Sequence, residues 1–343
     1  MNANLFISMA GNGLARAERA ANGDWRVEYP ITGQDMRCLA ADPSHPQILY
    51  AGTQGIGVVR SQDAGKTWQP AGLAGRIVKS LVVSTFPDGA AAGPGKIFAG
   101  TKSPASVFSS MDGGENWTEC EGFRQIRSRW FWFSPAEPPF TAYVQGIALS
   151  PSDPDVILAG IEAGAVVLSQ DGGKTWSDHR SGAVRDCHSL TFHATNGDWA
   201  YEAGGTGGAF SRDGGKTWRQ PRDGLDRRYG WSVAADPAHP EVWYLSASPG
   251  PSKAHSRNNA QAYIFRSVGG AAWEKLSGGL PQPLNYMPYS LITDQAAAGH
   301  LYAGLSNGDI WFSEDYGDHW EQLPLNLGGI HPSLIMMKEK EAN

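Results

Sequence analysis

The sequence predicts an all-β fold, a seven-bladed β-propeller, and three observations support this prediction. A short phrase that ends in tryptophan recurs along the whole chain, in well-preserved form at residues 61–68, 110–117, 169–176, 211–218 and 313–320. Segments that alternate apolar and polar residues and are rich in β-branched side chains precede these copies, which indicates strands. When two weaker copies are counted as well, successive copies lie roughly 40 to 60 residues apart, the period of a four-stranded propeller blade.

The recurring phrase has the composition of a tight hairpin turn. Asp171, in the third copy, can accept hydrogen bonds from backbone N–H groups just after it. The glycine pair that follows supplies the positive φ angles of such a turn. Trp176 then carries a large apolar ring into the space between neighbouring sheets. Two weaker copies, at residues 22–25 and 267–273, bring the number of blades to seven, although the second has lost its Asp.

This phrase resembles the Asp box, S-x-D-x-G-x-T-W, which is also called the BNR repeat. The repeat occurs in sialidases, xyloglucan-cleaving hydrolases, sortilin-type receptors and photosystem II assembly factors related to Ycf48. The resemblance implies a propeller whose boxes are structural turns rather than catalytic groups. The resemblance identifies almost no active-site residues in this chain, because the early Arg-Ile-Pro motif of sialidases is absent. The xyloglucan-cleaving relatives join two seven-bladed propellers around a cleft, whereas this chain supplies one.

Each blade is expected to hold four strands, A to D, with strand A nearest the axis. Candidate A strands align without gaps at residues 36–39, 78–81, 144–147, 187–190, 230–233 and 288–291. A seventh, 331–334, follows the last box, whereas residues 5–8 match strand B. We therefore predict that segment 331–338 pairs beside residues 4–9, because this pairing completes the first blade and removes open sheet edges. Since a closed ring is one unit, residues 1–343 form a single domain.

Composition limits the partners and the compartment. The net charge is −6, with 28 Lys and Arg against 34 Asp and Glu, and no basic face emerges, which argues against nucleic acid as a partner. No stretch approaches the ~18 apolar residues of a membrane span, and the amino terminus lacks a secretory pattern. The three cysteines are spaced without a recognisable pattern, which suggests a reducing compartment. No zinc-binding signature is present in the sequence. We expect a cytoplasmic protein with no membrane partner; a periplasmic or secreted form stays open.

Variation is concentrated on the face opposite the boxes, in the D–A and B–C connections. The longest D–A connection, 118–142, contains three arginines and the aromatic run 130–133. Long loops on a rigid scaffold are often functional, so this insertion is predicted to be a lid or ligand platform. An oligomer contact, a protein-partner surface and plain packing over the core are the alternatives. A second insertion, 246–262, lies in a B–C connection and contains His255.

The second column of the aligned A strands suggests a binding site. A column that faced the core would be apolar, whereas this one is polar and aromatic in six blades. Because side chains alternate along a strand, Tyr229 lies on the same side as Trp231. The predicted ligand-binding residues of this central funnel are Arg37, Lys79, Gln145, His188, Tyr229, Trp231, His255 and Tyr289. The alternative is a solvated channel mouth.

Three carboxylates are candidates for catalysis in the funnel. A glycosidase commonly uses two carboxyl groups that flank the scissile bond. Asp35 and Asp186 lie three blades apart, nearly opposite each other, and Glu162 lies in a B–C connection. Histidines could also reach the channel, but no His-x-His or similar spacing accompanies them. We therefore expect no metal and no cofactor.

Two functions are compatible with these features. The first is binding of a small molecule or carbohydrate in the central funnel, with glycoside hydrolase-like activity as its catalytic form. Aromatic funnel residues favour it, because they can stack on sugar rings. The second is a non-catalytic scaffold for protein binding or complex assembly, similar to the Ycf48-type propellers, which the lack of a transferable catalytic motif favours. Whether the protein is an enzyme stays open.

Overall fold

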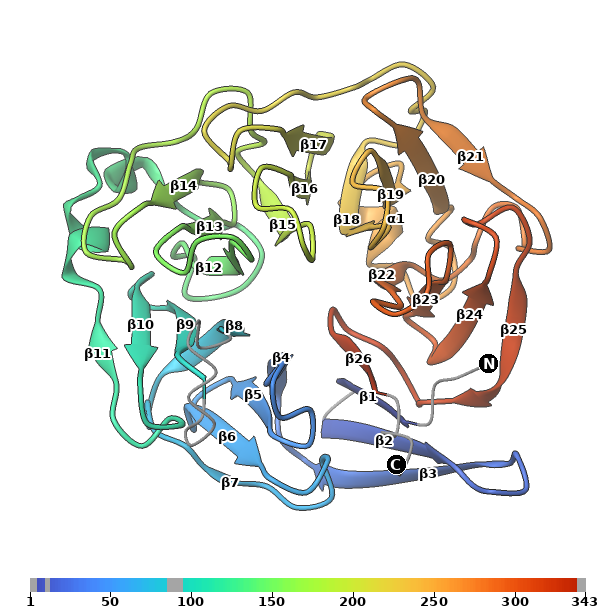
Figure 1. Ribbon diagram of the computed structural model, residues 1–343, viewed down its shortest axis with the longest axis horizontal. Helices are drawn as coiled ribbons and strands as arrows, with labels where there is room; N and C mark the ends of the chain where they lie inside the picture. The colour runs from blue at the N-terminus through green and yellow to red at the C-terminus, as the bar shows by residue number, and fades with distance from the viewer. Residues whose placement is uncertain (1–4, 10–12, 85–94, 338–343) are drawn as a thin grey trace.

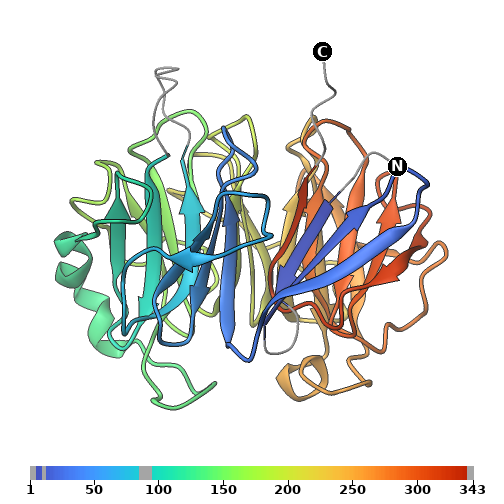
Figure 2. The ribbon, with the colours of Figure 1, turned by 90° about the horizontal axis from the view of Figure 1, so that it is seen from below.

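The structure, a computed structural model, describes residues 5–9, 13–84 and 95–337. These residues form seven antiparallel sheets that stand as blades around a central axis (Figure 1). Seen from the side, the blades form a short cylinder with loops at both ends (Figure 2). The predicted all-β, seven-bladed propeller is confirmed.

Four blades contain four strands in chain order, with the first strand nearest the axis. Blade 2 contains β4 (Met36–Ala41), β5 (Leu49–Thr53), β6 (Val58–Ser61) and β7 (Gln69–Pro70). Blade 3 contains β8 (Ile77–Val83), β9 (Ile97–Lys102), β10 (Val107–Ser110) and β11 (Thr118–Glu119). Blade 6 contains β18 (Tyr229–Ala235), β19 (Val242–Ser248), β20 (Tyr263–Val268) and β21 (Glu274–Leu276). Blade 7 contains β22 (Pro288–Thr293), β23 (Leu301–Leu305), β24 (Asp309–Ser313) and β25 (Glu321–Asn326).

Blades 4 and 5 contain three strands instead of the four predicted. Blade 4 contains β12 (Val144–Leu149), β13 (Ile157–Ile161) and β14 (Val166–Ser169), and blade 5 contains β15 (Cys187–Phe192), β16 (Ala200–Gly204) and β17 (Gly207–Ser211). In blade 4, side chains accept some of the hydrogen bonds that a fourth strand would otherwise accept from β14. The N–H of Leu168 donates to Ser177 Oγ at 3.0 Å, and that of Val166 donates to His179 Nδ1 at 3.2 Å. These edge donors are therefore satisfied without a regular fourth strand.

Blade 1 closes the ring by joining the two ends of the described chain. Its strand order is β26 (Leu334–Met337), β1 (Leu5–Met9), β2 (Gly13–Arg19) and β3 (Trp25–Thr32). Strands β26 and β1 are antiparallel, in a register that places Ser8 opposite Leu334 and Leu5 opposite Met337. The predicted closure is confirmed, although β26 begins three residues later than predicted. Residues 4 and 338 of that prediction lie outside the described residues.

The two faces of the ring carry different connections, as predicted. Box turns bond to the A–B turns: the N–H of Ala64 donates to the carbonyl of Gln47 at 2.9 Å. On the opposite face, B–C turns bond to the end of the D–A connections, as where the N–H of Glu162 donates to the carbonyl of Tyr143 at 3.2 Å. The two sets of turns therefore lie at opposite ends of the blades.

The five well-preserved boxes fold into the same turn. In the first, Asp63 Oδ1 accepts from the N–H of Thr67 at 2.9 Å, and Oδ2 accepts from the Thr67 hydroxyl at 2.6 Å. The Ser61 hydroxyl donates to Asp63 at 2.8 Å, and Trp68 Nε1–H donates to the carbonyl of Gly65 at 3.0 Å. The backbone bond recurs at Asp112, Asp171, Asp213 and Asp315. The predicted role of the aspartate as a turn acceptor is confirmed.

Apolar side chains of the described residues pack in layers between neighbouring blades. Strand β1 shows how alternation builds two layers at once: Phe6 packs against blade 7, whereas Ile7 and Met9 pack against blade 2. All five residues of β1 are buried. Each blade is consequently stabilised by both neighbours, and the pairing of β26 with β1 completes the last layer. No helix in the described ranges is long and apolar enough to cross a membrane.

Candidate functional site

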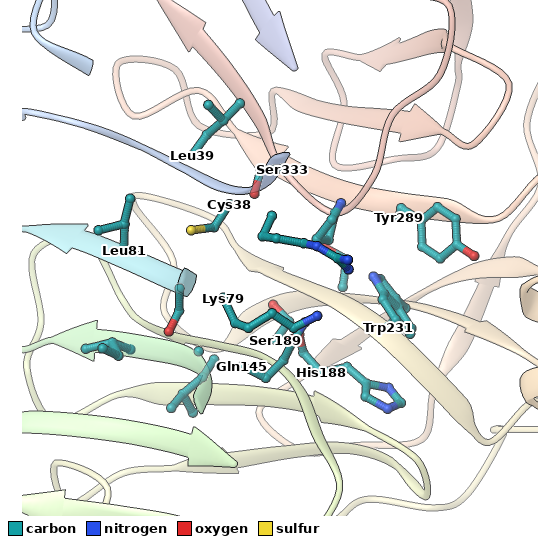
Figure 3. A pocket seen from close by; sticks show the side chains of 17 residues that line it. Cys38, Leu39, Lys79, Leu81, Gln145, His188, Ser189, Trp231, Tyr289 and Ser333 are labelled. Atoms are coloured by element: carbon teal, nitrogen blue, oxygen red, sulfur yellow. The ribbon is translucent and has the colours of Figure 1, made fainter. Parts of the chain in front are cut away.

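Six funnel side chains come from the A strands of six blades, and each lies at a β-bulge. Where β4 pairs with β5, the register shifts between Met36 and Cys38, so that Arg37 has no residue opposite. Equivalent shifts occur in five more A strands, at Lys79, Gln145, His188, Trp231–Ser232 and Tyr289. A bulge re-aims the extra side chain, and these six side chains line the central channel (Figure 3). The aligned sequence column is therefore a ring of bulge residues.

The channel widens into a cavity on the face that carries the insertions. The throat has a volume of about 160 Å³, and the wide part has a volume of about 680 Å³. The volume of the wide part is within the range that is typical of small-molecule sites, roughly 300 to 1,000 Å³. All eleven predicted site residues line the throat or the wide part: Asp35, Arg37, Lys79, Gln145, Glu162, Asp186, His188, Tyr229, Trp231, His255 and Tyr289. Their functional roles stay predictions.

One wall of the cavity is cationic and is closed by a carboxylate from the insertion. Glu137 Oε1 lies 2.7 Å from Lys79 Nζ and 3.3 Å from Lys102 Nζ. Its Oε2 lies 3.2 Å from Arg37 Nη1, and Arg37 Nη2 also pairs with Asp35 at 2.6 Å. Burial alone would raise the pKa of Glu137, but the hydrogen bond from Lys79 and the three cations outweigh it and lower the pKa to about 2. Glu137 is therefore ionised at neutral pH and ties the insertion to the funnel.

A second wall is aromatic and is organised around His255, which follows the short helix α1 (Pro251–Ala254). The Tyr229 hydroxyl lies 3.0 Å from His255 Nε2, and His255 Nδ1 lies 2.6 Å from the Tyr289 oxygen. Because the Tyr289 hydroxyl donates to the carbonyl of Ala254, we assign the proton to Nδ1 of a neutral imidazole. Burial lowers the pKa of His255 and favours this neutral form. Trp231 packs edge-on against both Tyr289 and His255, with ring centroids 5.0 Å away in each case.

A third wall is acidic and contains Glu162, Asp186 and His188. The Nε2 atom of His188 lies 3.5 Å from Asp186 Oδ2 and 3.7 Å from Glu162 Oε2. Burial raises the pKa of Glu162. Burial would also raise the pKa of Asp186, but His188 and the N–H of Ala163 lower it overall. For His188, burial opposes the charge, yet the neighbouring carboxylates of Asp186 and Glu162 raise its pKa. The wall thus combines two carboxyl groups with an imidazole.

The predicted acid–base partners Asp35 and Asp186 lie in different walls. Asp35 is held by Arg37, whereas Asp186 belongs to the group with Glu162 and His188. Both carboxylates line the wide part of the cavity. Asp35, Asp186 and Glu162 therefore remain candidates by position, and their acid and base roles stay predictions.

The insertion 118–142 divides into two parts with different surroundings. It contains the end of blade 3 and two short 3-10 helices, η1 (Glu121–Gln125) and η2 (Arg127–Phe131). Within the aromatic run, Trp132 packs on Phe123, but Trp130 and Phe131 are 88% and 85% exposed and lie outside the cavity lining. The later part, Pro135 to Glu137, lines the cavity. It projects from the same end of the cylinder as α1 (Figure 2).

Sequence reasoning missed Lys102 and Glu137. Lys102 ends β9, a B strand, and so lies outside the aligned column of A-strand residues. Glu137 lies in a stretch with three prolines and has no counterpart in other blades. The length of the insertion was the one available signal that this chain segment could reach the funnel.

No protein-family model matches the chain. The probable oligoxyloglucan-reducing end-specific xyloglucanase of Neosartorya fischeri is 28% identical over 115 residues, which are 29% of this chain and 13% of that protein. A GH74 enzyme of Niastella koreensis superposes with a TM-score of 0.65 at 16% identity, over 94% of this chain and 54% of the other. Ycf48 bound to a D1 peptide superposes with a TM-score of 0.53 at 15% identity, over 84% and 82% of the two chains.

These similarities concern the fold. The likeness to xyloglucan-cleaving and Ycf48-type propellers, which the boxes had suggested, is confirmed at the level of architecture. The chain spans 13% of the curated xyloglucanase and 54% of the GH74 chain, so it corresponds to part of either protein. This chain therefore shares a seven-bladed propeller architecture with carbohydrate-cleaving and peptide-binding proteins.

Proposed function

We propose that the central funnel binds a small, polyhydroxylated ligand of the carbohydrate class. The observation that carries this proposal is a cavity of about 680 Å³ that is lined by both aromatic and charged side chains. Trp231, Tyr229 and Tyr289 offer ring faces and edges on which the apolar face of a sugar can pack. Arg37, Lys79 and the acidic groups offer donors and acceptors for hydroxyl groups. Convergent polar groups in a concave, partly aromatic site are typical of ligand pockets.

Charge balance favours an uncharged ligand. Three cations, Arg37, Lys79 and Lys102, face the carboxylates of Asp35 and Glu137 on the same wall. A ligand with its own carboxylate would compete with Glu137 for these cations and would have to displace the insertion. A neutral sugar can hydrogen-bond to the charged groups without breaking these ion pairs. Neutral oligosaccharides are therefore the first compounds to test.

The test is calorimetric titration of the protein with neutral sugars, including xyloglucan oligosaccharides. Trp231→Ala and Arg37→Ala should each weaken binding about tenfold or more, because each removes a central contact. Arg26→Ala is the matched control, since its side chain is 80% exposed and pairs only with Glu28 among the described residues. Melting temperatures should stay within a few degrees. Equal affinity in all four proteins would contradict a funnel site.

The proposal extends to hydrolysis of the bound carbohydrate. Asp35, Asp186 and Glu162 are then the candidate catalytic residues. Two carboxyl groups beside a bound sugar can divide the acid and base or nucleophile roles. Asp186→Asn should then abolish release of reducing ends but leave oligosaccharide affinity within a few-fold. If the parent protein binds these sugars without turnover, the hydrolase part is wrong and the binding part stands.

A second candidate function is a scaffold that binds another protein through the insertion. Large aromatic side chains that are exposed together are typical of interaction surfaces. Trp130, Phe131, Phe133 and Phe140 are all exposed. The fold is shared with Ycf48 bound to a D1 peptide. Analytical sedimentation of the parent protein tests both self-association and peptide binding. The protein is measured at increasing concentration, alone and with extended apolar peptides. A protein that stays monomeric and binds none of the peptides would contradict this role.

A further inference from the structure

We propose that Glu162, Asp186 and His188 form a binding site for a divalent transition-metal ion in the acidic wall of the funnel. This inference goes beyond the proposed sugar binding and does not rest on it. It also departs from the sequence-based expectation of no metal, which relied on the lack of closely spaced histidines.

The positions of the three ligand atoms support such a site. One oxygen of Glu162, one oxygen of Asp186 and one ring nitrogen of His188 all lie within 4.8 Å of one another. The two distances to His188 Nε2 are 3.5 Å and 3.7 Å. Ligand atoms about 2.1 Å from a common tetrahedral ion are about 3.4 Å apart. Two of the three separations are thus close to the tetrahedral value, and the third, between the two carboxylate oxygens, is at most 4.8 Å.

The orientation of the His188 ring suits a metal ligand. Its Nδ1 lies 2.6 Å from the carbonyl oxygen of Gly230, which requires a proton on Nδ1. In the neutral ring, Nε2 then carries a lone pair directed at the two carboxylates. This Nε2 atom is buried, the His188 side chain is 1% exposed, and no hydrogen-bond partner within the described ranges satisfies the atom. A carbonyl that fixes the other ring nitrogen is the usual second-shell arrangement of metal-bound histidine.

The two carboxylates are also held in place by the fold. The N–H of Ala163 donates to Asp186 Oδ1 at 3.0 Å, which leaves Oδ2 directed toward His188. Glu162 begins the B–C turn, and its own N–H donates to the carbonyl of Tyr143 at 3.2 Å. His188 is a bulge residue of β15, so its ring leaves the strand toward the axis. Three ligands from two chain segments thus converge: Glu162 from the B–C turn of blade 4, and Asp186 with His188 from the start of β15.

The donor set limits the kind of ion. One imidazole with two carboxylates suits first-row ions from Mn²⁺ to Zn²⁺, whereas Mg²⁺ and Ca²⁺ prefer oxygen ligands alone. Two carboxylates balance the charge of a divalent ion. Three protein ligands leave coordination positions free, and Glu162 and Asp186 line the wide cavity. An ion at this place would present its open positions to whatever occupies the funnel.

Titration of the chelator-treated, full-length protein with Zn²⁺ alone tests the proposal. We expect one tightly bound ion per chain. Asp186→Asn and Glu162→Gln should each weaken binding about tenfold or more, because each replaces an anionic ligand by a similarly shaped amide. Co²⁺ should give visible absorption bands in the parent that both variants lose. The matched control is His319→Ala, which removes an exposed histidine that pairs with Asp315 at 2.6 Å and should leave Zn²⁺ affinity unchanged.

The proposal is overturned if the parent fails to bind one ion, or if both amide variants bind Zn²⁺ as the parent does. Loss of binding in His319→Ala would assign the ion to the surface instead. Should the amide variants fail to fold, anomalous scattering from a Zn²⁺-soaked parent crystal decides the matter. A peak among the three side chains supports the site, and a peak elsewhere overturns it.

Discussion

The box face and the funnel face of the same ring satisfy their polar groups in different ways. On the box face, Asp63 bonds to Ser61 and Thr67 within its own turn. Burial would raise the pKa of Asp63, but these local hydrogen bonds lower it to about 2. On the funnel face, Arg37 meets Glu137 from 100 positions along the chain. The box turn is thus held by bonds within itself, whereas this funnel pair joins distant segments of the chain.

This difference teaches why one face repeats and the other does not. A turn that satisfies its own donors works in any blade, so one phrase can recur unchanged. A funnel side chain depends on partners from other blades, and each blade can supply a different group. Variation at the funnel therefore leaves the architecture intact, which is how one scaffold can carry different sites. Four perturbations test this contrast, in order of decreasing effect.

The largest effect is expected from deleting the chain beyond Gly329. This removes β26 and exposes the edge of β1, whose five residues are all buried. We expect loss of soluble, cooperative folding, measured by expression yield, circular dichroism and thermal melting. Deleting only the last three residues, 341–343, is the control. A truncated protein that melts cooperatively near the parent temperature would show that closure is dispensable.

A smaller loss of stability is expected from Asp213→Ala on the box face. This change removes the acceptor of Thr217 N–H, which is bonded at 2.8 Å, and of the Thr217 hydroxyl, which is bonded at 2.6 Å. The free energy of unfolding should fall by about 1 to 3 kcal/mol in urea denaturation. Asp198→Ala, on the same face, should have little effect. Funnel binding, measured on folded protein, should stay unchanged; a selective loss of binding would break the division into two faces.

Glu137→Gln should destabilise the funnel face by about 1 to 2 kcal/mol at pH 7, because three cations lose their carboxylate. The folded-state pKa is lowered from 4.5 to about 2. The stabilising contribution is therefore complete above pH 4.5 and disappears as the pH falls toward 2. Unfolding free energies of parent and variant, measured from pH 7 to 3, should accordingly converge on acidification. A constant difference would show that the ion pairs do not stabilise the fold.

Hydrogen exchange gives the local form of the same experiment. In Glu137→Gln, amides of residues 132–142 should exchange faster at pH 7, whereas those of the box turns should not change. Equal acceleration on both faces would indicate a global loss of stability and not release of the insertion.

The smallest effect is expected for the double variant Trp130→Ser and Phe131→Ser. Because both side chains are almost fully exposed, the free energy of unfolding should change by less than about 0.5 kcal/mol. Phe123→Ser is the contrasting variant, since Phe123 is completely buried beside Trp132 and Trp176. A large destabilisation by the double variant would mean that the aromatic run supports the fold rather than a partner surface.

Much of the fold and part of the site could be predicted from the sequence. The boxes indicated the number of blades, and the alignment of the A strands placed the six bulge residues in one column. The prediction of a fourth strand was wrong for blades 4 and 5. In blade 4, the side chains of Ser177 and His179 accept hydrogen bonds from two edge donors in place of a regular backbone ladder. Lys102 and Glu137 were missed because no repeat marks them.

The sequence by itself determined the propeller and its closure, because turns and strand alternation depend on neighbours within one blade. Tertiary structure alone decided which groups meet in the funnel. Glu137 of the insertion meets Arg37 and Lys79 of two other blades, and Glu162 of blade 4 meets His188 of blade 5. The physical reason is that side-chain pairing across a channel depends on distances between blades, which no local pattern encodes.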